Sequence, residues 1–140
     1  VGVIAEIIMF AYANLFLKQF SWRTLVTACL ILTSLRWIAV GLFPNSFIAQ
    51  FIAQTIHAFS FGLFHMIAMR IIFQNFNASQ QGRGQALYST MWGLGVALGS
   101  ILAGKYWDVL SGECIFMIAG LSLIPAFIFV AGLPKVIQQN

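Results

Sequence analysis

Long apolar runs separated by short polar segments are the feature that most constrains how this chain can fold. Each run has about the 20 residues that an α-helix needs to cross a hydrocarbon core about 30 Å thick. Only 7% of the 140 residues are charged and 61% are apolar, whereas soluble domains contain about 25% charged residues. So few charges cannot cover a globule with a polar surface, which excludes a soluble enzyme and a disordered linker. The runs are also too long, and too regularly apolar, to be strands of a membrane barrel.

The runs predict an all-α integral membrane protein with five transmembrane helices. We expect one bundle over residues 1–140, with helices at residues 1–17, 24–43, 47–74, 86–107 and 114–133. The sequence starts without Met inside an apolar run, so we expect the chain to be a fragment of a longer protein. Its two cysteines lack metal-ligand spacing, and we expect them to be unpaired packing residues.

Basic residues occur in alternate connections between the predicted helices. Lys18 and Arg23 lie in the first connection, Arg83 lies in the third, and Lys135 lies in the C-terminal tail. The positive-inside rule therefore places these three regions, including the C-terminus, in the cytoplasm. Because the basic residues are scattered singly, the net charge of +4 does not indicate a nucleic-acid partner.

Four ionisable residues lie inside the predicted helices, where ionisable groups usually face a bundle interior or a wet cavity. Glu6, Arg36 and His57 lie about 15–18 Å from a helix end, near the middle of the bilayer; the fourth is His65. A Glu6–Arg36 ion pair is geometrically possible between the first two helices. It is open whether this is a structural pair, or whether Glu6 binds protons or substrate.

A polar stripe marks one face of the 47–74 helix. Its members follow one another at spacings of four or three residues: Gln50, Gln54, His57, Phe61 and His65. The stripe is either a bundle-interior face or the wall of a hydrated cavity, and the two imidazoles favour the cavity because they can exchange protons near neutral pH. A metal site would have no third ligand beyond Glu6, and no catalytic set of residues occurs, so we expect no metal and no cofactor.

The 86–107 helix carries small and aromatic residues with helical spacing. Gly95, Gly99 and Ala103 form a ridge that predicts close packing of another helix. Tyr88 and Trp92 lie one turn apart, and they either line a cavity or pack.

Four stretches of the chain resemble the C-terminal half of a major facilitator superfamily transporter, in particular the branch of 3-phenylpropionate transporters and nucleoside–proton symporters. The stretches are GVIAEIIMF (2–10), SLRWIAVG (34–41), AQTIHAFSFGLFHMIAMR (53–70) and GRGQALYSTMWGLGVALGSILAGKYWD (82–108). The Glu in the first stretch and the two His in the third are the most specific parts. The superfamily's cytoplasmic loop signature is degenerate here, because Lys18 and Arg23 are present without an Asp.

The resemblance implies that the five helices are the last five of twelve in a transporter, and not an enzyme. It implies proton-coupled symport of a small organic solute by alternating access in the bacterial inner membrane, together with the N-terminal half of the same transporter. The first, third and fourth helices would line the cavity, and the second and fifth would lie further out.

On this reading Glu6 and His57 bind protons or substrate, and His65 is a second polar wall residue. Gln54, Tyr88 and Trp92 complete the expected site, and Arg36 is a structural ion-pair candidate. The expected partners are lipid, the solute, protons and the N-terminal half, without nucleic acid. Two alternatives remain: a membrane scaffold or assembly subunit, and an intramembrane metal-dependent enzyme.

Overall fold

The structure, a computed structural model, describes residues 2–133 except for the side chains of residues 2–6, 13 and 14. All regular elements in that range are α-helices: α1 (Gly2–Gln19), α2 (Trp22–Leu42), α3 (Phe47–Asn75), α4 (Gln81–Leu121) and α5 (Ile124–Gly132). Three segments are long and apolar enough to cross a membrane: Trp22–Leu42, Phe47–Asn75, and Gln81–Gly132, which joins α4 and α5. The predicted all-helical membrane fold is confirmed to this extent.

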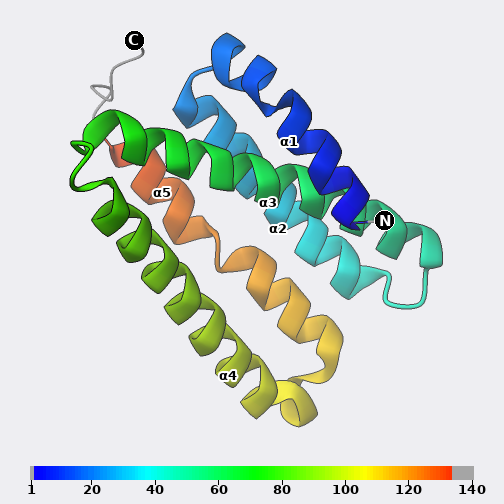
Figure 1. Cartoon of the computed structure of the whole chain (residues 1–140). Helices are drawn as coiled ribbons and strands as arrows, with labels where there is room; N and C mark the ends of the chain where they lie inside the picture. The colour runs from blue at the N-terminus through cyan, green and yellow to red at the C-terminus, as the bar shows by residue number, and fades with distance from the viewer. Residues whose placement is uncertain (1, 134–140) are drawn as a thin grey trace.

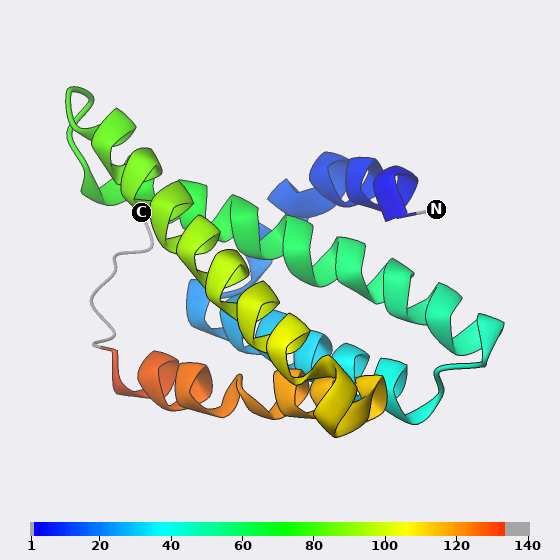
Figure 2. The ribbon, with the colours of Figure 1, turned by 90° about the horizontal axis from the view of Figure 1, so that it is seen from below.

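The helices run back and forth between two ends of the molecule (Figures 1 and 2). The α1–α2 connection, the α3–α4 connection and the end of α5 lie at one end. The α2–α3 connection and a sharp turn within α4 lie at the other. The basic residues Lys18, Arg23 and Arg83 therefore belong to the same end of the molecule.

Serine side chains define where α2 and α3 begin. The Ser21 hydroxyl accepts a hydrogen bond from the Thr24 amide at 3.2 Å, and the Ser46 hydroxyl accepts one from the Ala49 amide at 3.3 Å. Both serines are N-caps, which satisfy amide groups that have no partner inside the helix. The cap at Ser21 explains why α2 starts at Trp22, two residues before the expected helix.

A turn at Ser111 divides α4 into two helical segments that run in opposite directions (Figure 1). Ser111 has φ 62° and ψ 155°, a positive-φ conformation that a residue with a side chain rarely adopts. The turn lies in the expected connection between residues 107 and 114. The preceding segment starts at Gln81, five residues before the expected helix. The α3–α4 connection is therefore shorter than its polar sequence indicates.

The last expected helix, 114–133, is interrupted near its middle. The helix that follows the Ser111 turn ends at Leu121, and α5 begins at Ile124. Pro125 occupies the first turn of α5, where its missing N–H leaves no helical hydrogen bond unmade. Proline is therefore placed where it breaks the helix without a buried unpaired group.

The apolar core lies between α1, α2 and α3. Its buried members are Met9 and Leu17 of α1, Leu25, Val26, Cys29 and Leu30 of α2, and Leu63 and Ile67 of α3. α1 packs mainly on α3, whereas α2 packs on α3 and on the second segment of α4. The first segment of α4 exposes large apolar side chains, among them Leu94, Leu98 and Ile101, as expected for a surface that meets lipid.

Two glycines let α2 and the second segment of α4 approach closely. A Cβ on Gly41 would lie 2.8 Å from the Glu113 carbonyl oxygen, and one on Gly120 would lie 3.0 Å from the Ser34 carbonyl oxygen. The Ser34 hydroxyl donates a hydrogen bond to the Gly120 carbonyl oxygen at 2.9 Å. This contact is the small-residue packing typical of membrane helices.

The predicted ridge on the first segment of α4 is not where helices of this chain meet. A Cβ added to Gly95 or Gly99 would have no neighbour within 4 Å among the described residues. Ala103 is half-buried. Within residues 2–133 no helix packs closely on Gly95 and Gly99, so the expectation that this ridge receives another helix stays a prediction.

Candidate functional site

Three rings stack along one face of α3. The ring centroids of His57 and Phe61 lie 5.1 Å apart, and those of Phe61 and His65 lie 4.6 Å apart. Their spacing of four residues places them one above another on the helix. The expected shared face is thus present as a column of two imidazoles around one phenyl ring.

Helix α4 brings two aromatic side chains to this column. The Tyr88 hydroxyl and His65 Nδ1 are hydrogen-bonded at 2.5 Å, with either atom able to donate. Trp92 stands edge-on to both Phe61 and His65, with centroid distances of 5.3 and 5.2 Å. Tyr88 and Trp92 therefore connect α4 to the polar face of α3.

A cavity of about 500 Å³ lies between α2, α3 and α4. Its polar lining residues are Cys29, Thr33 and Arg36 of α2 and His57 and Ser60 of α3. Aromatic walls come from Trp37, Phe61, Phe64 and Trp92. His65 and Tyr88 are not among the lining residues and contact the cavity wall through Phe61 and Trp92.

Arg36 is a buried cation in the wall of this cavity, with 7% of its surface exposed. Its guanidinium carbon lies 4.1 Å from the centre of the Trp37 ring, a cation–π contact. Its Nε is buried and makes no hydrogen bond within the part of the chain that the structure describes. A buried charge with an unpaired donor is costly unless a partner binds it.

The expectation that the second helix lies away from the cavity is wrong for this cavity. Five residues of α2 line it, namely Leu30 and the four residues Cys29, Thr33, Arg36 and Trp37. α1 contributes no described lining residue, since it packs on a different side of α3. The spacing of these four residues, which places them on one helix face, is the signal in the sequence that could have found them.

Two further expected site residues are not among the described residues that line this cavity. Gln54 is exposed on α3 and is not among the lining residues of the cavity. Glu6 belongs to α1, but its side chain lies outside the described residues, and so does the expected Glu6–Arg36 pair. Among the described side chains, no three His, Cys, Asp or Glu residues lie close enough together to hold a metal ion.

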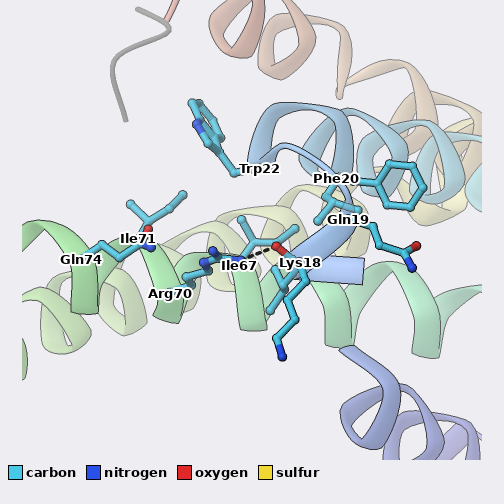
Figure 3. Close-up of a pocket in the computed structure, with 10 residues that line it drawn as sticks. Lys18, Gln19, Phe20, Trp22, Ile67, Arg70, Ile71 and Gln74 are labelled. Atoms are coloured by element: carbon cyan, nitrogen blue, oxygen red, sulfur yellow. Dashed lines mark hydrogen bonds between the residues drawn. The ribbon is translucent and has the colours of Figure 1, made fainter. Parts of the chain in front are cut away.

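A second, smaller cavity of about 300 Å³ lies between the α1–α2 connection and α3, at the end of the molecule that carries Lys18, Arg23 and Arg83 (Figure 3). Lys18 and Arg70 line it together with Trp22 and Gln74. Arg70 Nη1 donates a hydrogen bond to the Leu17 carbonyl oxygen, which satisfies one of the unpaired carbonyl groups at the end of α1. Arg70 thus ties α1 to α3 and does not simply extend toward solvent.

The family described as "MFS_1 like family" matches residues 1–118. This chain belongs to the MFS_1-like family. A curated relative, the "Probable 3-phenylpropionic acid transporter" of Escherichia coli (strain K12), is 30% identical to this MFS_1-like chain over 143 aligned residues. The alignment covers 99% of the chain but 35% of the relative, so the chain spans about a third of that protein's length. No solved structure matches the chain significantly.

Membership of the MFS_1-like family makes the chain a transporter-type membrane protein with several apolar helices. This agrees with the resemblance found in the sequence. Neither alternative, the scaffold subunit or the intramembrane enzyme, is favoured by the family or by the relative.

Proposed function

We propose that this chain is part of a proton-coupled symporter that moves a small organic solute across the bacterial inner membrane by alternating access. The observation that carries the proposal is the cavity of about 500 Å³ lined by Arg36, His57 and Trp92 in a chain of the MFS_1-like family. Cavities of this size suit small organic molecules. Ionisable groups inside a membrane bundle usually belong to solute or proton pathways.

The name of the relative supports an aromatic acid as the first solute to test. The aromatic walls of the cavity suit such a solute, because Trp37, Phe61 and Trp92 offer ring faces and edges for stacking.

For the proton, we propose Glu6, His57 and His65 as binding groups. Tyr88 and Trp92 contact His65, and Gln54 lies one helical turn before His57; we propose that these three residues support the site. An unperturbed imidazole has a pKa of about 6.5 and exchanges protons under physiological conditions. Protonation of His65 Nδ1 would change its hydrogen bond with Tyr88, and would thereby change the contact between α3 and α4.

Alternating access needs two helical bundles that rock around a shared site. We therefore propose that residues 1–140 form part of the C-terminal bundle, span the bilayer five times, and work with the N-terminal half of the same transporter. The basic residues Lys18, Arg23 and Arg83 at one end of the bundle support a cytoplasmic position for that end. We propose that the C-terminal tail, which contains Lys135, is cytoplasmic too.

An uptake assay tests this function. The chain replaces the matching segment of the E. coli relative, and the chimaera is expressed in cells that lack the native transporter. We expect accumulation of labelled 3-phenylpropionate that a protonophore abolishes. Accumulation no greater than in cells with an empty vector, or accumulation that the protonophore leaves unchanged, would contradict the proposal.

A further inference from the structure

We infer that the cavity between α2, α3 and α4 selects aromatic monocarboxylates, and that Arg36 binds their carboxylate. This inference rests on the proposed function, because it names the residue that recognises the carboxylate of the aromatic acid proposed there. It gives Arg36 a role different from the structural ion pair expected from the sequence.

An anionic partner would stabilise the buried positive charge of Arg36. The side chain is buried, its Nε is unpaired among the described residues, and no described carboxylate lines the cavity. A guanidinium presents parallel N–H donors that fit the two oxygens of one carboxylate. The missing partner is therefore one that the solute can supply.

Trp37 holds the guanidinium at a defined place in the wall. The planar cation lies 4.1 Å from the centre of the indole ring, and stacking of this kind leaves the edge donors of the guanidinium available for a ligand. Arg36 is thus oriented by the ring of its neighbour in sequence.

The rest of the wall fits an arene. Phe61, Phe64 and Trp92 are aromatic, and the polar groups besides Arg36 are the small side chains of Cys29, Thr33 and Ser60 together with His57. A sugar or nucleoside carries many hydroxyl and amide groups, each of which needs a hydrogen-bond partner when buried. An aromatic solute with a single carboxylate therefore fits this cavity, which has one cation and mainly apolar walls, better than a sugar or a nucleoside does.

The number of charges limits the solute to one carboxylate. Arg36 is the sole permanent cation among the described lining residues, so a second carboxylate would enter without a fixed counter-charge. A cationic amine would meet like charge from Arg36.

Binding to the full chain in lipid nanodiscs, measured by calorimetry, tests the inference with three probes: 3-phenylpropionate, the neutral 3-phenylpropan-1-ol, and propionate. We expect the aromatic acid to bind at least about tenfold more tightly than either other probe, as the loss of one charge-assisted hydrogen bond or one aromatic contact predicts.

Arg36→Gln should weaken binding of the aromatic acid by about tenfold or more, and should change binding of the alcohol by less than about twofold. Arg36→Lys keeps the charge without the paired donors, so its affinity for the aromatic acid should lie between those of the unchanged chain and of Arg36→Gln. Arg23→Gln is the matched control: Arg23 also has unpaired nitrogens and lies over a Trp ring, but it does not line this cavity. It should bind all three probes like the unchanged chain.

Equal affinity of the unchanged chain for acid and alcohol would overturn the inference without any variant. Loss of acid and alcohol together in folded Arg36→Gln would overturn it too, since Arg36 would then only support the fold. If the chimaera transports the aromatic acid equally well with Arg36→Gln, the inference fails while the transport function stands. If acid binding depends on Arg36 but no uptake occurs, the transport function fails while the inference stands.

Discussion

Tyr88 shows how a single side chain links two helices of this protein. Its hydroxyl is hydrogen-bonded to His65 Nδ1 at 2.5 Å, and its ring stands edge-on to the imidazole with a centroid distance of 5.2 Å. Few other contacts hold the first segment of α4 against α3, because most of its side chains are exposed. The bond therefore matters for the position of that segment.

Replacing Tyr88 with Phe should remove the hydrogen bond and keep the ring contact. We expect the free energy of unfolding to fall by about 0.6 kcal/mol, the average for hydrogen bonds between membrane helices. Unfolding in mixed micelles measures this change. Tyr106→Phe is the control, since Tyr106 is exposed on the same helix and makes no hydrogen bond among the described residues. Equal stability of the two variants would show that the His65 bond contributes nothing.

The sequence predicts part of the arrangement of these side chains. The spacing of His57, Phe61 and His65 predicts a shared face, and the structure shows that face as a ring column. Whether Tyr88 and Trp92 would meet it depends on how α4 is placed, which helical spacing does not determine. Whether Arg36 pairs with Glu6 stays a prediction, because depth along a helix does not determine which neighbour a side chain faces.

Gly41 and Gly120 let α2 lie very close to the second segment of α4. Both glycines lie where a Cβ would come within 3.0 Å of another atom, including a backbone oxygen that cannot rotate away. This close approach places α2 beside the second segment of α4, and it leaves the other face of α2 to line the cavity.

Gly41→Ala and Gly120→Ala should each lower the free energy of unfolding by about 1–3 kcal/mol, because the added methyl group overpacks the contact. Gly99→Ala is the matched control, since a Cβ there meets nothing among the described residues. It should be neutral, or stabilising by up to about 1 kcal/mol through the helix preference of alanine. Destabilisation by Gly99→Ala, with no effect of Gly120→Ala, would mean that the ridge on α4 is the packed one.

The apolar runs predict which segments are helical, but they do not predict which helices pack against each other. The polar connections predict where the chain leaves each helix to within a few residues, as the starts of α2 and α3 show. The glycine pattern on α4 predicts a packing ridge at Gly95 and Gly99, whereas the close contact between α2 and α4 in this structure is made at Gly41 and Gly120. Small residues make close approach possible, and the arrangement of the whole bundle decides which of them are used.

Most described basic residues lie at one end of the molecule, and the other end carries its described acidic groups together with Lys105. Lys18, Arg23 and Arg83 lie near the first end, and Asp108 and Glu113 flank the Ser111 turn at the other. By the positive-inside rule, this asymmetry predicts that the end with Lys18, Arg23 and Arg83 lies in the cytoplasm.

Single cysteines in the connections test this orientation in a chain whose native cysteines are replaced. Asn45→Cys, in the α2–α3 connection, should react with an impermeant maleimide in intact cells. Gln80→Cys, in the α3–α4 connection, should react only after the cells are permeabilised. The reverse pattern would place the basic end outside, and reaction of both in intact cells would mean that α3 does not span the membrane.

The central claim is that solute and protons move together through this bundle. The most direct measurement is the internal pH of proteoliposomes that contain the chimaera, recorded after 3-phenylpropionate is added outside at zero membrane potential. We predict internal acidification that depends on the solute and is much reduced when His57 and His65 are both replaced by Ala. Solute entry without acidification, or acidification that persists unchanged in the double variant, would contradict the account.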